Sequence, residues 1–317
     1  MGDLATAVRV PAGPRRFAYD SGEPAVVEVG SGTSLVFETL DCFSNLLSSP
    51  EQRFRTEAEL IELVGAFNPV SGPVAVSGAV PGDALAITVG QISLGARAVT
   101  VLHADPELDL PFGDTRVCAV EGDTVWFPTS LGRLALPARP MVGTLGVASA
   151  GPAFPSLLSH ARCGGNMDCQ ALRPGSVLVL PVEVPGGLVS LGDVHALMGD
   201  AEITGTALEA GAEVTVRVDL LPGTGRAMAG PYLDEPHRIG TVGCAHGVSV
   251  DQNLRSAMTE LRRRLVEECG YRPGEAYELL GAVAEVTVNQ CVHGGWSSVH
   301  AAVPRYVLPS HLSHPSP

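Results

Sequence analysis

Residues 163–209 read CGGNMDCQALRPGSVLVLPVEVPGGLVSLGDVHALMGDAEITGTALE, and they join short apolar segments through turns rich in glycine and proline. Short apolar segments bounded by turn residues are typical of β-strands. Residues 176–184 are almost continuously apolar, so we expect a strand that is buried on both faces. This stretch therefore predicts a core built mainly from strands.

The rest of the chain predicts further strands and three helical insertions. Apolar residues at helical spacing predict helices over residues 51–64, about 251–270 and about 273–281. In the second of these, Asp251 is a natural N-cap and Gly270 a natural stop. We expect strands over residues 25–38, 74–80, 84–92, 116–120, 124–127, 214–220 and 285–290. The predicted fold class is mainly β with α+β elements, a β-sandwich-like core with a few helical insertions.

Length and composition indicate a folded domain with an ample core. The chain has 317 residues, of which 45% are hydrophobic and only 5% aromatic, and 37 glycines and 25 prolines punctuate it. The core must then be built from Val, Leu and Ala, with many turns. We expect one catalytic unit over residues 1–317, either undivided or with subdomains of about 1–150 and 151–305, and a flexible tail over residues 306–317.

The net charge and the length of the apolar runs exclude two classes of binding partner. A net charge of −14 disfavours nucleic acid, whose binding depends on clustered basic residues. The longest apolar runs are far shorter than a membrane span, and the first twenty residues lack the apolar core of a secretory signal. We therefore expect a cytoplasmic protein that binds neither nucleic acid nor membrane.

The absence of lysine excludes several catalytic mechanisms. All 20 of the basic residues are arginine, and the chain has no lysine. Schiff-base enzymes, pyridoxal-phosphate enzymes, lysine-containing phosphate loops and the Cys-Glu-Lys and Ser-Ser-Lys amide hydrolases all need the missing amine.

Cysteine offers a second kind of nucleophile. The seven cysteines are an odd number without a CxxC pair, which argues against a disulfide framework. A thiol hydrolase using Cys163 or Cys169 with a nearby histidine is one hypothesis. Free cysteines are most often buried core residues, which favours a structural interpretation of both.

Residues 163–209 also concentrate side chains that bind metals. Asp193 and His195 lie two residues apart, as do Asp200 and Glu202, so on extended segments each pair would point to one side. A surface hairpin with solvated acids is the alternative. Asn166 follows two glycines that permit unusual backbone conformations, which favours a metal or catalytic site. The candidate residues are Asn166, Asp168, Asp193, His195, Asp200 and Glu202.

Four segments resemble the acetamidase/formamidase family, in the same order and at compatible spacing. They read HARCGGNMD, LPVEVPGGLVSLGDVHALMGDAEITGTALE, FNPVSGPVAVSGAVPGDALAITV and GEAYELL, and together they sample nearly the whole chain. The resemblance implies a β-rich fold, a metal-dependent amidase that releases ammonia from a small amide, and a homo-oligomer. It implies a divalent metal, with zinc the preferred ion and calcium a candidate elsewhere.

The family motifs fall on defined positions of this chain. Gly-Gly-Asn-x-Asp matches residues 164–168, Gly-Asp-x-His matches 192–195, the second acidic pair matches 200–202, and Phe-Glu-Thr-x-Asp matches 37–41. The last match suggests that Asp41 or Glu38 also reaches the site.

The resemblance also suggests roles. We expect Asp168 and His195 as metal ligands, with Asp193 or Asp41 completing the shell. Glu202 is the candidate general base, which takes a proton from water and passes it to the leaving amine.

Two further residues complete the predicted catalytic set. Asn166 is expected to hold the amide or its developing oxyanion. Asp200 is counted with the catalytic residues as the partner of Glu202.

Two departures from the family pattern bear on the substrate. Met198 stands where the family has glutamine, and Ala201 stands where it has glycine. Near the C-terminus, Cys291, His293 and the run over residues 294–296 replace an acidic turn. Two alternatives therefore stay open: a hydrolase or lyase of a larger biosynthetic substrate, and a binding protein that has lost amidase activity.

Overall fold

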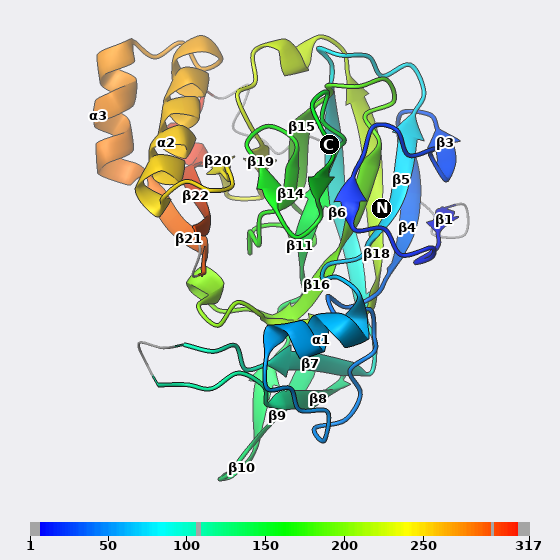
Figure 1. The fold of residues 1–317 in the computed structure, drawn as a ribbon. Coiled ribbons are helices and arrows are strands. Elements are labelled where there is room, and N and C mark those ends of the chain that lie inside the picture. Colours follow the sequence, from blue (N-terminus) through cyan, green and yellow to red (C-terminus); the bar gives the residue numbers. More distant parts are fainter. Residues whose placement is uncertain (1–6, 106–108, 293–294, 310–317) are drawn as a thin grey trace.

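The computed structural model describes residues 7–105, 109–292 and 295–309. Most of its regular structure is strand, as predicted, and it forms two large sheets with a small third one (Figure 1). The nine-stranded sheet has the order β1-β4-β18-β6-β15-β19-β20-β22-β21. Its strands are β1 Val8–Val10, β4 Thr33–Thr39, β6 Ala84–Leu94, β15 Val177–Pro181, β18 Ala212–Leu221, β19 Tyr232–Asp234, β20 Arg238–Gly243, β21 Glu285–Val292 and β22 Trp296–Pro304.

The second large sheet has the order β10-β9-β8-β7-β17-β16-β11-β14-β13, and β5 joins it by pairing with both β16 and β3. Its strands are β3 Val27–Val29, β5 Val70–Val76, β7 Arg97–Val101, β8 Thr115–Glu121, β9 Thr124–Thr129, β10 Gly132–Pro137, β11 Met141–Gly146, β13 Ser159–His160, β14 Gly164–Asn166, β16 Val189–Leu197 and β17 Leu208–Ala210. The small sheet pairs β2 Ala18–Tyr19 with β12 Phe154–Pro155.

The main core contains residues of both large sheets. Leu35 and Ile87 come from the first sheet, Leu145 and Leu191 from the second, and all four are fully buried in one apolar cluster. Facing sheets that share a core form a sandwich. The alternating burial of β18 and the buried interior of β15 agree with their sequence patterns.

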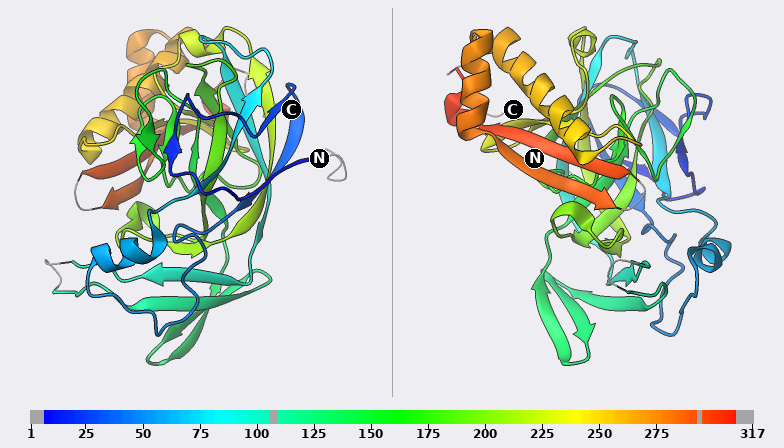
Figure 2. Two further views of the ribbon diagram at one scale, coloured as in Figure 1. Left: turned by 45° about the vertical axis from the view of Figure 1, so that its right-hand side comes forward. Right: turned by 60° about the vertical axis from the view of Figure 1, so that its left-hand side comes forward.

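The described residues contain the three predicted helices, which are α1 Glu57–Val64, α2 Val250–Glu267 and α3 Pro273–Val283. Helices α2 and α3 pack beside β20 and β22, whereas α1 lies with β7 and β8 at the other end (Figures 1 and 2). The described part of the chain contains no helix with the length and apolarity of a membrane span.

Several predicted boundaries are wrong. Helix α1 begins at Glu57 rather than residue 51, because Thr56 caps it by accepting a hydrogen bond from the Glu59 amide. Helix α2 is capped by Ser249 rather than Asp251, through a capping box with Gln252. The prediction also missed β22, which continues the sheet after the strand expected over residues 285–290.

Candidate active site

Strand pairing brings distant carboxylates around one histidine. Strands β14 and β16 both pair with β11, which places Asp168, just after β14, near Asp193 and His195 of β16. Across the next pair, Glu209 of β17 lies opposite His195. These four residues are almost completely buried.

The geometry around His195 leaves several polar atoms without a hydrogen bond. Its Nε2 atom lies 3.4 Å from Glu209 Oε2, 3.5 Å from Asp193 Oδ1 and 3.9 Å from Asp168 Oδ1. Both ring nitrogens of His195, together with Asp168 Oδ1 and Glu209 Oε2, are buried without a hydrogen-bond partner. Buried polar atoms are nearly always partnered, so these atoms have the arrangement expected around a bound ion.

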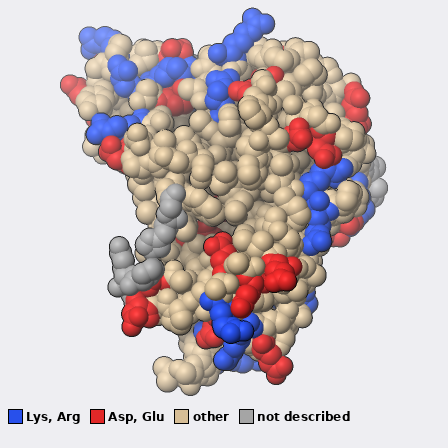
Figure 3. All heavy atoms as spheres, in the orientation of Figure 1, with Lys and Arg blue, Asp and Glu red and all other residues tan. Residues whose placement is uncertain are grey.

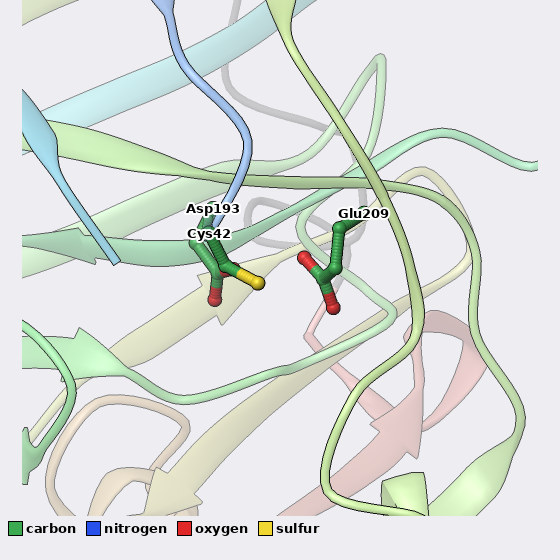
Figure 4. Close-up of side chains that lie close together, drawn as sticks. All are labelled: Cys42, Asp193 and Glu209. Carbon is green, nitrogen blue, oxygen red and sulfur yellow. The ribbon is translucent and has the colours of Figure 1, made fainter. Parts of the chain in front are cut away.

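Among the described residues, potential ligand atoms form three overlapping groups. Asp168, Asp193 and His195 form one, His195, Glu202 and Glu209 form another, and in each the atoms lie within 4.8 Å of one another. The third group consists of Cys42, Asp193 and Glu209, whose side chains lie close together in Figure 4. Imidazole, carboxylate and thiolate are the ligands that zinc takes in proteins, so the residues fit a divalent metal.

Unusual backbone conformations build this cluster. Asp168, Asp193 and Glu202 have φ values of +46°, +54° and +41°, in the left-handed region that side chains other than glycine rarely adopt. Asp193 and His195 both lie in strand β16 and contribute to one ligand group, as their spacing predicted, and Asp193 combines this with a left-handed φ. Strain of this kind is often retained at functional sites.

The structure separates the second acidic pair. Asp200–Glu202 form a 3-10 turn instead of an extended segment, so their two side chains diverge. Glu202 is 7% exposed and belongs to the ligand cluster. Asp200 is exposed and accepts a hydrogen bond from Gln170 Nε2 at 2.6 Å. The expectation that both acids point to one side is wrong.

Asp41 has a local role in the structure. Its Oδ1 atom accepts hydrogen bonds from the backbone amides of Phe43 and Asn45, at 3.0 and 2.6 Å. Burial raises its pKa to about 6, against the lowering effect of these two bonds. It is the next residue, Cys42, that contributes an atom to the ligand groups.

Asn166 belongs to a buried polar network beside the cluster. Its Oδ1 atom accepts hydrogen bonds from Asn68 Nδ2, at 2.9 Å, and from the Thr144 hydroxyl. Asn68 Nδ2 also donates to Asp193 Oδ2 at 3.0 Å. The side-chain oxygen of Asn166 is therefore occupied by hydrogen bonds within the protein. Its side-chain NH2 group is left to donate a hydrogen bond to a ligand.

Sequence reasoning missed Gln290, an amide that reaches the site from β21. Its Nε2 atom donates to Asp168 Oδ2 at 2.5 Å. The Met198 side chain, at the position of the family's glutamine, is buried and lines a neighbouring pocket of about 440 Å³ instead. Position 198 thus supplies no amide side chain to the site, but Gln290 supplies one from another strand. Cys291 is exposed, and His293 lies outside the described residues.

Other contributors to the site were missed for a similar reason. Cys42 and Thr144 lie outside the matched segments, and Asn68 lies in one of them without being singled out; the fold brings all three near the site. Glu209 carried a usable signal, because it closes the stretch 163–209 and a returning strand would place it beside His195.

Burial dominates the electrostatics of the carboxylates. It raises the pKa of Asp168 and of Glu209 well above the ordinary range, and neighbouring acids reinforce both shifts. Burial, aided by Asp193, raises the pKa of Glu202 to about 7. Several acids this close cannot all ionise without a compensating cation. The electrostatics therefore also favour a bound cation.

The thiols fit a structural interpretation. Cys163 and Cys169 are fully buried. Burial raises the pKa of Cys169 to about 12 and that of Cys163 further. Because the thiolate is the nucleophile, these environments argue against a thiol hydrolase.

The cluster opens into a cavity of about 550 Å³. Asn166, Asp168, Asp193, Glu202 and Glu209 contribute to its lining. A ligand in the cavity can thus reach the carboxylates and the Asn166 amide together.

Known proteins resemble this chain in sequence and in fold. It is 41% identical to a protein of Schizosaccharomyces pombe named as a formamidase and 37% identical to an acetamidase of Mycolicibacterium smegmatis, over 23% and 30% of this chain. The aligned segments span only 20% and 25% of those two proteins. The crystal structure of an acetamidase from Bacillus halodurans matches 94% of this chain and 98% of its own, with 28% identity and a TM-score of 0.85.

The family assignment rests on the part of the chain that carries the cluster. The pattern of the acetamidase/formamidase family matches residues 141–308, more than half of the chain, and this range includes Asp168, Asp193, His195, Glu202 and Glu209. The chain belongs to the acetamidase/formamidase family.

Proposed function

We propose that this protein hydrolyses the carbon–nitrogen bond of an amide and releases ammonia and a carboxylate. The observation that carries the proposal is the buried cluster around His195, with its unpartnered ligand atoms, at the lining of a cavity. The names of the relatives, formamidase and acetamidase, support the same reaction class.

A divalent metal is part of the proposal, and zinc fits the donors best. His195 Nε2, Asp168 Oδ1 and Asp193 Oδ1 would hold it, with Glu209 Oε2 on the other side of His195. When bound, such an ion polarises a carbonyl and makes water a better nucleophile at neutral pH.

The protein's own groups would position the amide and move the proton. Glu202 takes a proton from the attacking water and delivers it to the departing nitrogen, which leaves as ammonia. The NH2 group of Asn166 donates a hydrogen bond to the amide oxygen as its negative charge grows. Gln290 holds Asp168 in place through its bond to Oδ2.

The test combines metal content with ammonia release. We expect dialysis against a chelator to remove activity on formamide and acetamide, zinc to restore it, and thiol alkylation to leave it unchanged. Ammonia release that survives complete metal removal would overturn the metal, and silence on every amide tried, with zinc present, would overturn the amidase.

Matched variants test the ligand assignment. Asp168→Ala and His195→Ala should each lose the metal in elemental analysis. Asp200→Ala should retain it, because that side chain is exposed and bonded to Gln170. Asp123→Ala, at an exposed turn, is the control for a removed surface acid. Metal retained by both ligand variants would refute the assignment.

We also propose a homo-oligomer, as the family resemblance suggests, and a location in the cytoplasm, as the sequence of the first twenty residues suggests. Light scattering on the purified protein and fractionation of the source cells are the direct measurements. A single-chain mass, or recovery outside the cytoplasm, would contradict the respective part.

A further inference from the structure

The cavity is large for the amides after which the relatives are named. Its volume is about 550 Å³. Drug-sized ligands occupy pockets of roughly 300–1,000 Å³, and one water takes up about 30 Å³ of liquid. Acetamide carries one methyl group beside its amide, so it would leave most of this space to solvent.

Aromatic side chains gather on the wall of the cavity. Phe43, Phe67, Phe112 and Trp296 all line it, although the whole chain has only eight phenylalanines and two tryptophans. Phe43 and Phe67 meet edge to face, with ring centroids 6.0 Å apart. In a chain so poor in aromatics, this gathering indicates a surface for an apolar group of similar size.

The charges of the lining are unsuited to an anionic group. Among the described lining residues, Arg55 is the only basic side chain of the Lys/Arg type. It is 92% exposed, and its Nε atom already lies 3.5 Å from Glu59 Oε1. Glu57 and Asp105 also line the cavity, and Figure 3 shows acidic side chains, with a basic cluster among them, on the lower half of this face. A substrate with a second carboxylate would meet repulsion here.

We propose that the substrates are primary amides. Their acyl group carries no charge and includes an apolar part about the size of a phenyl ring. This inference rests on the proposed amidase function and names the substrate class of the same site. The C–N bond of the amide breaks, water supplies the new C–O bond, and ammonia leaves with the proton. The acyl group lies against the aromatic wall while the amide faces Asn166 and the carboxylates.

A substrate series tests the proposal. The zinc-loaded protein is assayed for ammonia release from acetamide, phenylacetamide and the anion succinamate. Burial of a phenyl group predicts a kcat/KM about 100-fold higher for phenylacetamide than for acetamide, and succinamate should be the poorest of the three. Acetamide hydrolysed as well as or better than phenylacetamide would overturn the substrate class while leaving the amidase intact.

A binding measurement decides the proposal even if no amide is turned over. The two tryptophans are Trp126, on β9, and Trp296, which lines the cavity. In the Trp126→Phe variant Trp296 is the only tryptophan, so phenylacetamide should change the tryptophan emission saturably and acetamide at equal concentration should not. An unchanged emission would overturn the proposal. A saturable change without hydrolysis would support the cavity while counting against the amidase function.

Paired variants locate the effect on the wall. Phe112→Ala should raise KM for phenylacetamide about 10-fold and leave KM for acetamide unchanged. Phe54→Ala is the matched control, because Phe54 packs against the same apolar cluster without lining the cavity. If Phe112→Ala does not fold, Phe112→Leu gives a smaller change in the same direction. Equal effects of the variants at positions 54 and 112 would refute the contact.

Discussion

Gly143 of β11 leaves room for the carboxylate cluster. A Cβ atom at this position would lie 2.6 Å from Asp168 Oδ1 and 2.7 Å from Asp193 Oδ2, closer than such atoms approach. We therefore expect Gly143→Ala to displace two proposed ligands and to weaken zinc binding by about 10–100-fold. Competition with a chromophoric chelator measures this affinity.

The control for Gly143→Ala is another glycine-to-alanine change. Gly281 lies in α3, where an added Cβ atom meets nothing within 4 Å. Gly281→Ala should leave zinc affinity unchanged and raise the free energy of unfolding by about 0.5–1 kcal/mol. Unchanged zinc affinity in Gly143→Ala would show that the cluster does not hold the metal as proposed.

Ala201 carries backbone strain where the family has glycine. Its φ of +68° lies in the left-handed region, which costs a residue with a Cβ atom about 1–2 kcal/mol. We expect Ala201→Gly to raise the free energy of unfolding by about 1 kcal/mol, measured by urea denaturation. Ala282→Gly, in α3, should lower it by about 1 kcal/mol. A destabilised Ala201→Gly protein would contradict the strain.

Site residues that lie in a recognisable local motif could be predicted from the sequence. Residues that reach the site only because distant strands pair could not. The glycines at positions 164 and 165 were expected to adopt unusual conformations, and they have φ values of +78° and +94°. Nothing local indicates that Gln290 bonds to Asp168, since 122 residues separate them. The departure at Met198 was visible in the sequence, but the amide that replaces it was not.

At the scale of elements, Ser249 and Asp251 are the two candidates for the N-cap of helix α2. The Ser249 hydroxyl oxygen accepts a hydrogen bond from the Gln252 backbone amide, and the Ser249 backbone amide donates one to Gln252 Oε1. Ser249→Ala should therefore lower the free energy of unfolding by about 1 kcal/mol. Asp251→Ala should cost only about 0.2–0.5 kcal/mol, because Asp251 is exposed and forms an i,i+4 ion pair with Arg255. The reverse order in thermal or urea denaturation would restore Asp251 as the cap.

The type of each element could be predicted from its apolar periodicity. The neighbours of a strand in its sheet depend on the topology of the whole chain. The alternation in β18 predicted a half-exposed strand, and its apolar residues Val214, Val216 and Val218 are buried. That β18 lies between β4 and β6 is not written in its own residues. Similarly, β22 is buried along most of its length, which removes the alternation by which a strand is recognised.

At the scale of the whole molecule, the two halves of the chain share both sheets. Strand β18 lies between β4 and β6, and β16 pairs with β5, β11 and β17. We expect one cooperative thermal transition, because neither half keeps its sheet neighbours without the other. Far-UV circular dichroism and tryptophan fluorescence should give coincident curves. Separate transitions would show that the halves fold as subdomains.

Metal removal should act on this same global transition. Without a cation, Asp168, Glu202 and Glu209 lie buried around His195, so the folded state bears the repulsion between these acids or must take up protons. An ion that binds only the folded state stabilises it by about 2.7 kcal/mol at one hundred times its dissociation constant. We therefore expect the chelated protein to unfold at a lower temperature in scanning calorimetry, and zinc to restore the transition in proportion to the logarithm of its concentration. Asp200→Ala should show the full shift, because its carboxylate lies outside the cluster, whereas His195→Ala should show little. A transition temperature that is the same with chelator and with zinc would mean that the cluster binds no metal that matters to folding.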